Sequence, residues 1–138
     1  MTKSEIMKIL PHRDNMLLVE EVNLEGDVSV GKYTIKGDEY FLQGHFPNNP
    51  VVPGVILCEM MGQAACLLIT GDTENCTPYF TGMKNVKFKQ KVVPGDTFIS
   101  KCELIKKMGV FYIIKAMGYV SDKLCCQGEF SFAVIKDV

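Results

Sequence analysis

The chain has 138 residues, which fits one domain, and we predict a single domain over residues 1–138. Its composition, 47% hydrophobic and 22% charged, is ordinary for a soluble globular protein. The formal net charge of −1 gives no bulk electrostatic attraction for nucleic acid, and we expect no signal peptide because the N-terminal residues lack its pattern.

The sequence before the middle of the chain predicts a short helix, two strands and a loop. The helix covers residues 4–10, with Ser or Thr as N-cap and Pro11 just past its end. The strands cover residues 16–24 and 28–36. Residues 37–53 combine turn formers with aromatic side chains, which indicates a loop that packs rather than a floppy one.

The longest apolar stretch, residues 51–69, predicts a buried helix. It starts at Pro53-Gly54 and ends at Thr70-Gly71, residue types that are common at the ends of helices. The stretch is at the short end for a membrane span and contains Glu59, and a charge at mid-bilayer costs at least ~2.5 kcal/mol. A helix that is apolar all round is instead buried on all sides, so other elements must wrap around it.

Four strands are predicted after this helix, because the segments are rich in Val, Ile, Phe and Tyr and are separated by glycines. They cover residues 79–88, 97–107, 110–121 and 124–135. Two strands before the helix and four after it predict one antiparallel sheet curled around one central helix, an α+β fold.

The cysteines indicate a reducing compartment. Without a secretion signal, we expect six reduced thiols and a cytoplasmic location rather than disulfides. No CxxC pair occurs, and neither histidine has metal-ligand spacing from a cysteine, so we predict no metal site. The six are Cys58, Cys66, Cys76, Cys102, Cys125 and Cys126.

Glu59 is the one carboxylate within the predicted buried helix, and Gln63, one turn on, is neutral. Burying an isolated carboxylate is costly, so the group must take up a proton or find partners. A carboxyl group that keeps its proton in an apolar cleft can act as a general acid at neutral pH. Two structural explanations stay open: Glu59 is solvated at the helix rim, or it forms a buried ion pair.

His45 lies in the loop that leads into this helix. Gly44 permits unusual backbone angles before it, and Pro47 stiffens the chain after it. Such a segment holds a side chain in place, which catalytic groups need. A purely structural histidine is the other explanation.

Pro53-Gly54-Val55 opens the helix, where the first backbone N–H groups have no partner within the helix. Gly54 would let a ligand approach them, so that they stabilise an oxygen that gains negative charge. Alternatively, Gly54 only permits tight packing. A base, an acid and this backbone site together suit removal of a proton α to a thioester carbonyl, followed by loss of a β-hydroxyl.

Several motifs follow one another along nearly the whole chain: Leu10-Pro11-His12-Arg13, Leu17-Leu18-Val19, Gly44-His45-Phe46-Pro47-x-x-Pro50-x-x-Pro53-Gly54-Val55-x-x-x-Glu59-x-x-x-Gln63, Phe80-x-Gly82, Phe88 and Val93-Pro94-Gly95-Asp96. In this order they resemble the FabZ-type (3R)-hydroxyacyl-[acyl-carrier-protein] dehydratases. The segment from the histidine to the glutamate is the most specific part of the resemblance.

The resemblance implies a hot-dog fold, in which the sheet wraps the long helix. It also implies a homodimer whose active sites each take the histidine from one chain and the glutamate from the other, often assembled further as a trimer of dimers. The expected substrate is a (3R)-3-hydroxyacyl group on the phosphopantetheine arm of acyl-carrier protein, the expected product is the trans-2-enoyl thioester of fatty acid biosynthesis, and no cofactor is expected.

The resemblance also implies a role for each site residue. His45 is the base at the α-carbon, and Glu59 assists departure of the hydroxyl. The Gly54 N–H binds the thioester carbonyl, and the backbone of Val55 helps to orient the site. His12 falls in a structural motif of the family, and we assign it no catalytic role.

The chain departs from the family pattern at two places. Asp14-Asn15 stand where an aromatic residue and a proline are usual, and Glu20-Glu21 stand where an Asp-Arg pair is common. These changes remove apolar bulk and reverse a charge. They bear on local packing, and on carrier or chain-length preference, more than on the chemistry.

One segment holds four lysines and no acid: Lys84, Lys87, Lys89 and Lys91. The last three alternate with other residues, which predicts that they share one strand face. Such a patch could steer an acidic partner such as acyl-carrier protein. A solvated face whose lysines protect a strand edge is an equally good explanation.

Two other functions stay open. A hot-dog acyl thioesterase would use its carboxylate to activate water at the carbonyl, but the fixed spacing of His45, Gly54 and Glu59 argues against it. A non-catalytic acyl-carrier-binding module is suggested by the unusual residues 14–21, whereas the presence of both His45 and Glu59 argues for catalysis.

Overall fold

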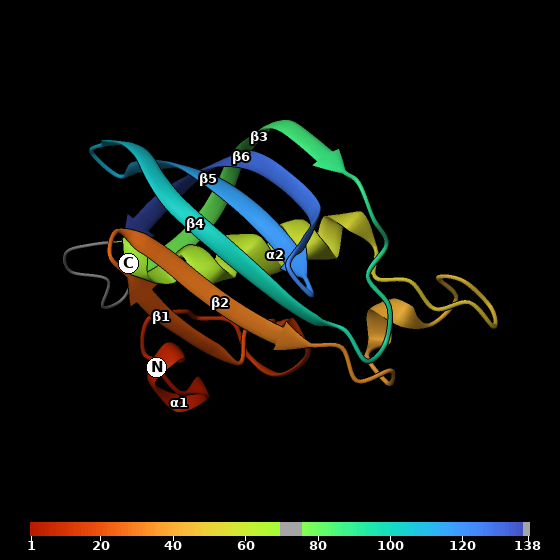
Figure 1. Cartoon of the computed structure of the whole chain (residues 1–138). Helices are drawn as coiled ribbons and strands as arrows, with labels where there is room; N and C mark the ends of the chain where they lie inside the picture. The colour runs from red at the N-terminus through yellow and green to blue at the C-terminus, as the bar shows by residue number, and fades with distance from the viewer. Residues whose placement is uncertain (70–75, 137–138) are drawn as a thin grey trace.

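One antiparallel sheet curls around one helix in the computed structural model, which describes residues 1–69 and 76–136 (Figure 1). The strand order is β1-β2-β4-β5-β6-β3, and all neighbouring pairs are antiparallel. This confirms the expected α+β fold, with two strands before the helix and four after it in the described chain. The strands are β1 (Glu21–Glu25), β2 (Val28–Thr34), β3 (Cys76–Phe88), β4 (Thr97–Met108), β5 (Phe111–Val120) and β6 (Lys123–Lys136).

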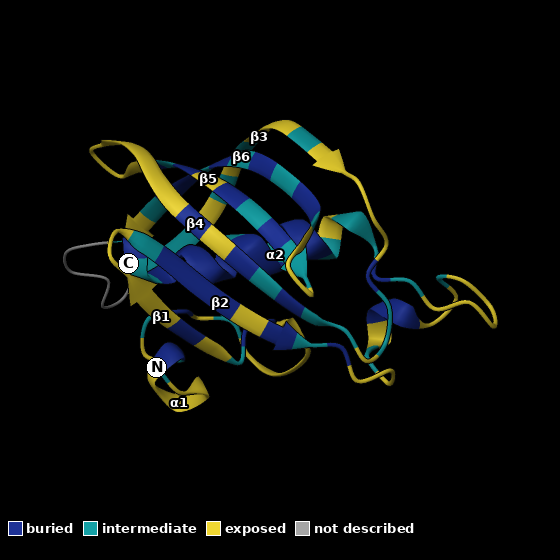
Figure 2. Ribbon diagram, viewed as in Figure 1, coloured by how far each residue is buried: buried dark blue, intermediate teal, exposed yellow. Residues whose placement is uncertain are grey.

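The concave face of the sheet and the helix share one core. Side chains alternate along a strand, so every second residue faces the helix. Along β5 these are Tyr112, Ile114 and Ala116, all buried, and in β6 Phe130 and Phe132 are buried as well. Figure 2 shows that buried residues make up much of the central helix and alternate with less buried ones along β5 and β6. The period-two pattern of the sequence therefore sets which face of the sheet curls inward.

The central helix, α2 (Gly54–Ala64), is shorter than predicted and continues as a 3₁₀ turn, η3 (Ala65–Leu68). The predicted end at Thr70-Gly71 lies outside the described residues. Most of the helix is buried, but the expectation of burial on all sides is wrong at its first turn, where Val55 is 72% exposed. Within the described residues, no helix has the length and apolar character that crossing a membrane requires.

The N-terminal segment packs on the outside of the helix–sheet body. Its helix, α1 (Lys3–Ile6), is shorter than the predicted 4–10, and the Glu5 carboxylate accepts hydrogen bonds from the Thr2 N–H at 3.2 Å and the Thr2 hydroxyl at 2.9 Å. This is a capping box, which satisfies donors that the first turn leaves free. A second apolar cluster joins the segment to the body through Ile6, Leu10, Leu17, Val19, Val22 and Cys66.

The predicted strand 16–24 begins only at Glu21, because a buried side chain of α2 takes the backbone groups before it. The Leu18 N–H donates to Gln63 Oε1 at 2.8 Å, and the Gln63 amide nitrogen donates to the Met16 carbonyl at 2.8 Å. These groups are therefore satisfied without a neighbouring strand. A 3₁₀ turn, η1 (Asp14–Met16), precedes this extended stretch.

The loop before the helix is packed in its first half only. A 3₁₀ turn, η2 (Tyr40–Leu42), buries Phe41 and Leu42 in the core. The rest projects from the body as an arm (Figure 1), and Phe46 on it is 52% exposed. The expectation of a packed loop is therefore confirmed at Phe41 and wrong at Phe46.

Five of the cysteines are buried thiols rather than members of disulfides: Cys58, Cys66, Cys102, Cys125 and Cys126. Burial disfavours the thiolate, so it raises the pKa of Cys58 to about 11 and the pKa values of Cys66 and Cys126 to about 12. These side chains therefore act as small apolar core residues.

Candidate active site

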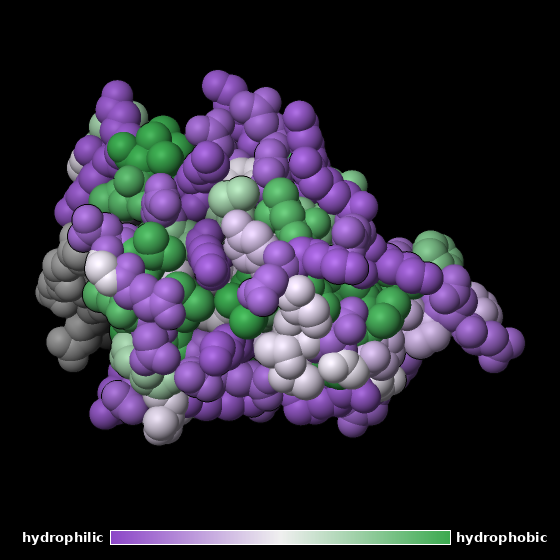
Figure 3. Space-filling view, viewed as in Figure 1, coloured by the Kyte–Doolittle hydropathy of each residue, from purple (hydrophilic) through white to green (hydrophobic). Residues whose placement is uncertain are grey.

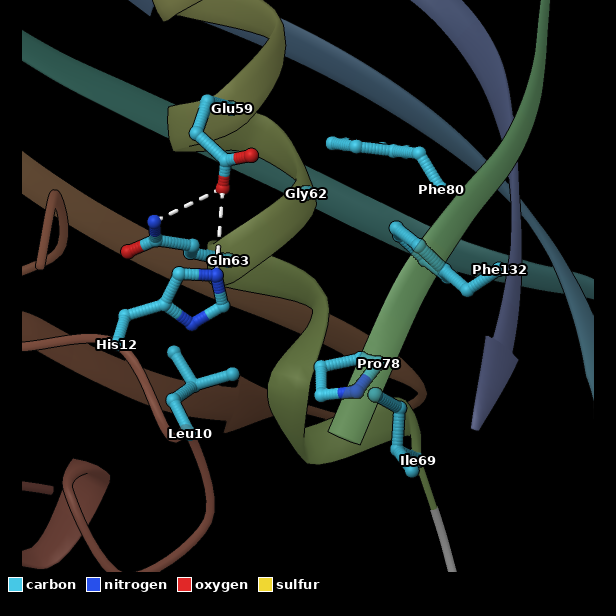
Figure 4. A pocket seen from close by; sticks show the side chains of 9 residues that line it. All are labelled: Leu10, His12, Glu59, Gly62, Gln63, Ile69, Pro78, Phe80 and Phe132. Atoms are coloured by element: carbon cyan, nitrogen blue, oxygen red, sulfur yellow. Dashed lines mark hydrogen bonds and ion pairs between the residues drawn. The ribbon is translucent and has the colours of Figure 1, made fainter. Parts of the chain in front are cut away.

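Glu59 projects from the middle of α2 into a largely apolar cavity (Figure 4). Its side chain is 22% exposed, so it is neither fully buried nor at an open helix rim. The cavity is closed by the N-terminal segment on one side and by strand residues on the other. Its lining consists of Leu10, His12, Glu59, Gly62, Gln63, Ile69, Pro78, Phe80 and Phe132.

Gln63 fixes one oxygen of the Glu59 carboxylate. Because Gln63 Oε1 accepts the Leu18 N–H, its amide nitrogen must face the opposite way. That nitrogen donates to the Met16 carbonyl and, at 2.9 Å, to Glu59 Oε2. Gln63 is only 2% exposed, and its orientation is set by the Leu18 N–H and the Met16 carbonyl, both fixed parts of the backbone.

His12 is a neighbour of Glu59 that sequence reasoning missed. Its Nε2 lies 3.6 Å from Glu59 Oε2, although the two residues come from different segments of the fold. Burial lowers the pKa of His12 more than the carboxylate of Glu59 raises it, and Arg13 lowers it further. The signal that could have found His12 is the one applied to His45, a histidine beside a stiffening proline.

His45 is held at the base of the projecting arm with one ring nitrogen committed. Its Nδ1 lies 2.9 Å from the Val51 carbonyl, which can only accept, so Nδ1 carries the proton. Its ring also stacks on Phe46, with centroids 4.3 Å apart. Nε2 is then left with its lone pair free, which is the form that a general base requires.

The start of α2 lies beside His45 in a separate groove. The Ile56 and Leu57 N–H groups both donate to the Pro53 carbonyl, which leaves Gly54 and Val55 as the N–H groups at the very start of the helix. The groove is lined by His45, Val51, Val52, Pro53, Gly54, Val55, Leu57, Phe88, Lys89, Gln90 and Lys91.

Tight packing is one reason for a glycine at this position. A Cβ at Gly54 would lie 2.8 Å from the ring of Phe88 on β3, which is closer than side chains pack. The glycine therefore lets the ring lie directly over the helix start. The same lack of a side chain keeps the backbone N–H accessible from the groove, so packing and ligand access do not compete here.

The two predicted catalytic residues do not meet within one chain. His45, Gly54 and Val55 line one groove, whereas Glu59 lines the other cavity. The sequence motif that joins them therefore places His45 and the helix start at one site and Glu59 at another.

Comparison with known proteins places these features in a family. Residues 10–129 match the model of the FabA-like domain. The 3-hydroxyacyl-[acyl-carrier-protein] dehydratase FabZ of Petrotoga mobilis is 40% identical over 99% of both chains, and that of Clostridium perfringens is 40% identical over 97% of this chain and 99% of its own.

Among solved structures, the dehydratase heterocomplex ApeI:P from Xenorhabdus doucetiae superposes with a TM-score of 0.77 at 17% identity, over 94% of this chain and 90% of that one. At this identity the likeness concerns the fold alone, and it confirms the expected hot-dog architecture. The full-length identity to the bacterial enzymes goes further: the chain belongs to the FabA-like domain family and, within it, to the FabZ 3-hydroxyacyl-[acyl-carrier-protein] dehydratases.

Proposed function

We propose that two copies of the chain dehydrate (3R)-3-hydroxyacyl-[acyl-carrier protein] to trans-2-enoyl-[acyl-carrier protein], with His45 and Glu59 of each site on different protomers. The observation that carries this proposal is the separation of the two residues. His45 is held by the Val51 carbonyl and Glu59 by the Gln63 amide, yet the two residues line different cavities of one chain. A second protomer supplies the Glu59 that the His45 groove lacks, and the His45 that the Glu59 cavity lacks.

The reaction follows from the atoms that these groups present. Nε2 of His45 takes the α-proton, and the electron pair of that C–H bond forms the double bond as the β-carbon–oxygen bond breaks. The N–H of Gly54, aligned by the backbone of Val55, stabilises the thioester oxygen while it carries negative charge. Glu59 gives its proton to the departing hydroxyl, so water leaves. These proton transfers require no metal or redox cofactor, and the reducing cytoplasm suits the buried thiols.

The edge strand β3 is the best candidate for the dimer contact. It has a partner on one side only, β6, and it carries three large apolar side chains that are about half exposed: Tyr79, Met83 and Phe88. An open edge with such side chains is a template for pairing with a second copy. The exposed Phe46 on the arm is a further contact for that copy.

A second apolar surface supports further assembly, as in a trimer of dimers. Hydrophobic side chains gather near the β4–β5 turn (Figure 3), where Ile105, Met108, Val110 and Phe111 are each about half exposed. Because this surface lies at the opposite end of the sheet from the groove of His45 (Figure 1), it can be covered without blocking that groove.

The lysine segment borders the groove, but not as one strand face. The predicted face of Lys87, Lys89 and Lys91 is wrong, because β3 ends at Phe88 and the last two lysines lie beyond it. Lys89 and Lys91 instead line the groove that holds His45. Their charge there suits the phosphate and the acidic surface of acyl-carrier protein better than a role in guarding an edge.

Reversing the charge at both groove lysines, Lys89→Glu with Lys91→Glu, is expected to raise KM for carrier-bound substrate about tenfold, because rim charges mainly govern encounter with a charged partner. KM for a short thioester without carrier should change little. Steady-state kinetics with both substrates measures the difference. The matched control, Lys32→Glu with Lys115→Glu at exposed positions of β2 and β5, makes the same charge change elsewhere, and an equal rise in KM there would contradict a local carrier site.

The reaction itself is tested by incubating the protein with 3-hydroxyacyl and acyl thioesters and following the enoyl product and free thiol. Dehydration yields enoyl thioester without thiol. Release of thiol without enoyl product would show a thioesterase, and neither product would show a non-catalytic binding module.

A further inference from the structure

The segment that carries His12 is fixed by its neighbour. The Arg13 guanidinium donates to the carbonyls of Leu10 and His12, both at 2.7 Å, and to that of Met7 at 3.0 Å. Leu10 is 2% exposed and anchors the same segment in the second apolar cluster. The His12 ring is therefore held over the cavity by bonds that do not involve Glu59.

The surroundings of the ring favour one tautomer of neutral His12. Its Nδ1 is shielded from solvent and has no hydrogen-bond partner within residues 1–69 and 76–136. A proton there would be a buried donor without an acceptor, whereas a proton on Nε2 points at Glu59 Oε2, 3.6 Å away. That distance is long for a hydrogen bond, as is common in sites without substrate, and full charge on the carboxylate draws the two groups together.

Both donors approach the same carboxylate oxygen. Gln63 donates to Oε2 at 2.9 Å, and His12 Nε2 lies 3.6 Å from the same oxygen (Figure 4). An acid proton on Oε2 would point into these N–H groups, so it belongs on Oε1. Figure 4 shows that oxygen directed toward Phe80, across the cavity.

Glu59 and Arg13 are the charged groups that act on His12. The other side chains that line the cavity, from α2, β3, β6 and the N-terminal segment, carry no charge. The pKa of His12 lies below its ordinary value, so the ring is a neutral donor at neutral pH and does not become the proton source itself.

We propose that His12 is a positioning residue for the dehydration: with Gln63 it binds Oε2 of Glu59, directs the acid proton to Oε1 and stabilises the carboxylate that forms when this proton leaves. The inference rests on the proposed function for its catalytic meaning. The contact between His12 and Glu59 does not depend on the proposed function, and it can be tested without any turnover.

The contact is tested by NMR titration of the histidine C2–H signals in the whole protein, which contains only two histidines. In Glu59→Gln the negative partner of His12 is gone, so the midpoint of its titration should fall by about one pH unit. An unchanged His12 midpoint in Glu59→Gln would overturn the pairing, whatever the enzyme's activity.

The role is tested by the pH dependence of kcat/KM in two variants. His12→Phe keeps a ring but has no donor, so kcat should fall about tenfold while KM changes less than about twofold. Without the donor, the carboxylate that remains after proton transfer is less stable. The loss of activity at high pH should therefore move upward by about one pH unit.

His12→Gln restores an N–H donor that does not titrate, and it should keep most of the activity and the original pH limit. If both variants lose activity equally with no shift of the pH limit, His12 only fills space and the inference fails. A wild-type protein without dehydratase activity would instead overturn the proposed function, and the NMR titration would still decide the pairing.

Discussion

Glu59→Gln is expected to lower kcat/KM for dehydration about 10²–10⁴-fold, the usual cost of losing a positioned general acid. The amide has the volume of the carboxyl group and can still accept the Gln63 N–H bond, but it has no acid proton to give to the hydroxyl. The fold should persist, because the carboxylate makes no bond on which the core depends. The rate of enoyl thioester formation measures the loss of activity, and the melting temperature measures whether the fold persists.

Two further variants sharpen this result. Glu59→Asp retains an acid on a shorter side chain and should fall between the wild type and Glu59→Gln. His45→Ala removes the base and should lose turnover to a similar extent while the arm keeps its backbone bonds, including Val51 N–H to the His45 carbonyl at 2.8 Å. Wild-type rates in either Glu59→Gln or His45→Ala would refute the role assigned to that residue.

Mixing Glu59→Gln with His45→Ala should restore activity to about a quarter of the wild-type value. In a two-fold symmetric dimer each site takes His45 from one chain and Glu59 from the other, so a mixed dimer has one site with both lesions and one with neither. Random exchange makes about half of all dimers mixed, and each of these has one working site. The measurement is activity against time after the two proteins are combined at equal concentration.

Chain exchange must be followed independently, by native mass spectrometry of protomers that differ in mass. Recovery that tracks the mixed species supports a site shared between protomers. Mixed dimers that form and stay inactive would show that His45 and Glu59 act within one chain, in contradiction of their separation into two cavities. Each variant mixed with itself is the control.

The order of elements could be predicted from the sequence because it rests on local pattern. Alternating burial in β5 and the apolar run of α2 each follow from periodicity, and the sheet wrapped around the helix follows from them. Strand 16–24 was predicted too long because Gln63, distant in sequence, takes the backbone groups of Met16 and Leu18. Local pattern cannot show that a side chain distant in the sequence takes the backbone hydrogen bonds of a predicted strand.

The residues suited to proton transfer could be predicted from the sequence by their type. The contacts between side chains in the folded chain could not. His45 and Glu59 stand out as residues suited to proton transfer, and their roles stay predictions. His12 was passed over because its relation to Glu59 exists only after the N-terminal segment folds against α2. The lysine face failed because β3 ends at Phe88, which leaves Lys89 and Lys91 beyond the strand, and alternation alone does not reveal where a strand ends.

The buried cysteines have a practical consequence for measuring this enzyme. Because burial raises the pKa values of thiols such as Cys58 and Cys126, they resist alkylating and disulfide reagents while the chain stays folded. A colorimetric thiol reagent in the product assay therefore detects the free thiol that a thioesterase would release, with little background from these side chains. The same reagent labels them once the core opens, so their labelling rate reports how often the native protein unfolds.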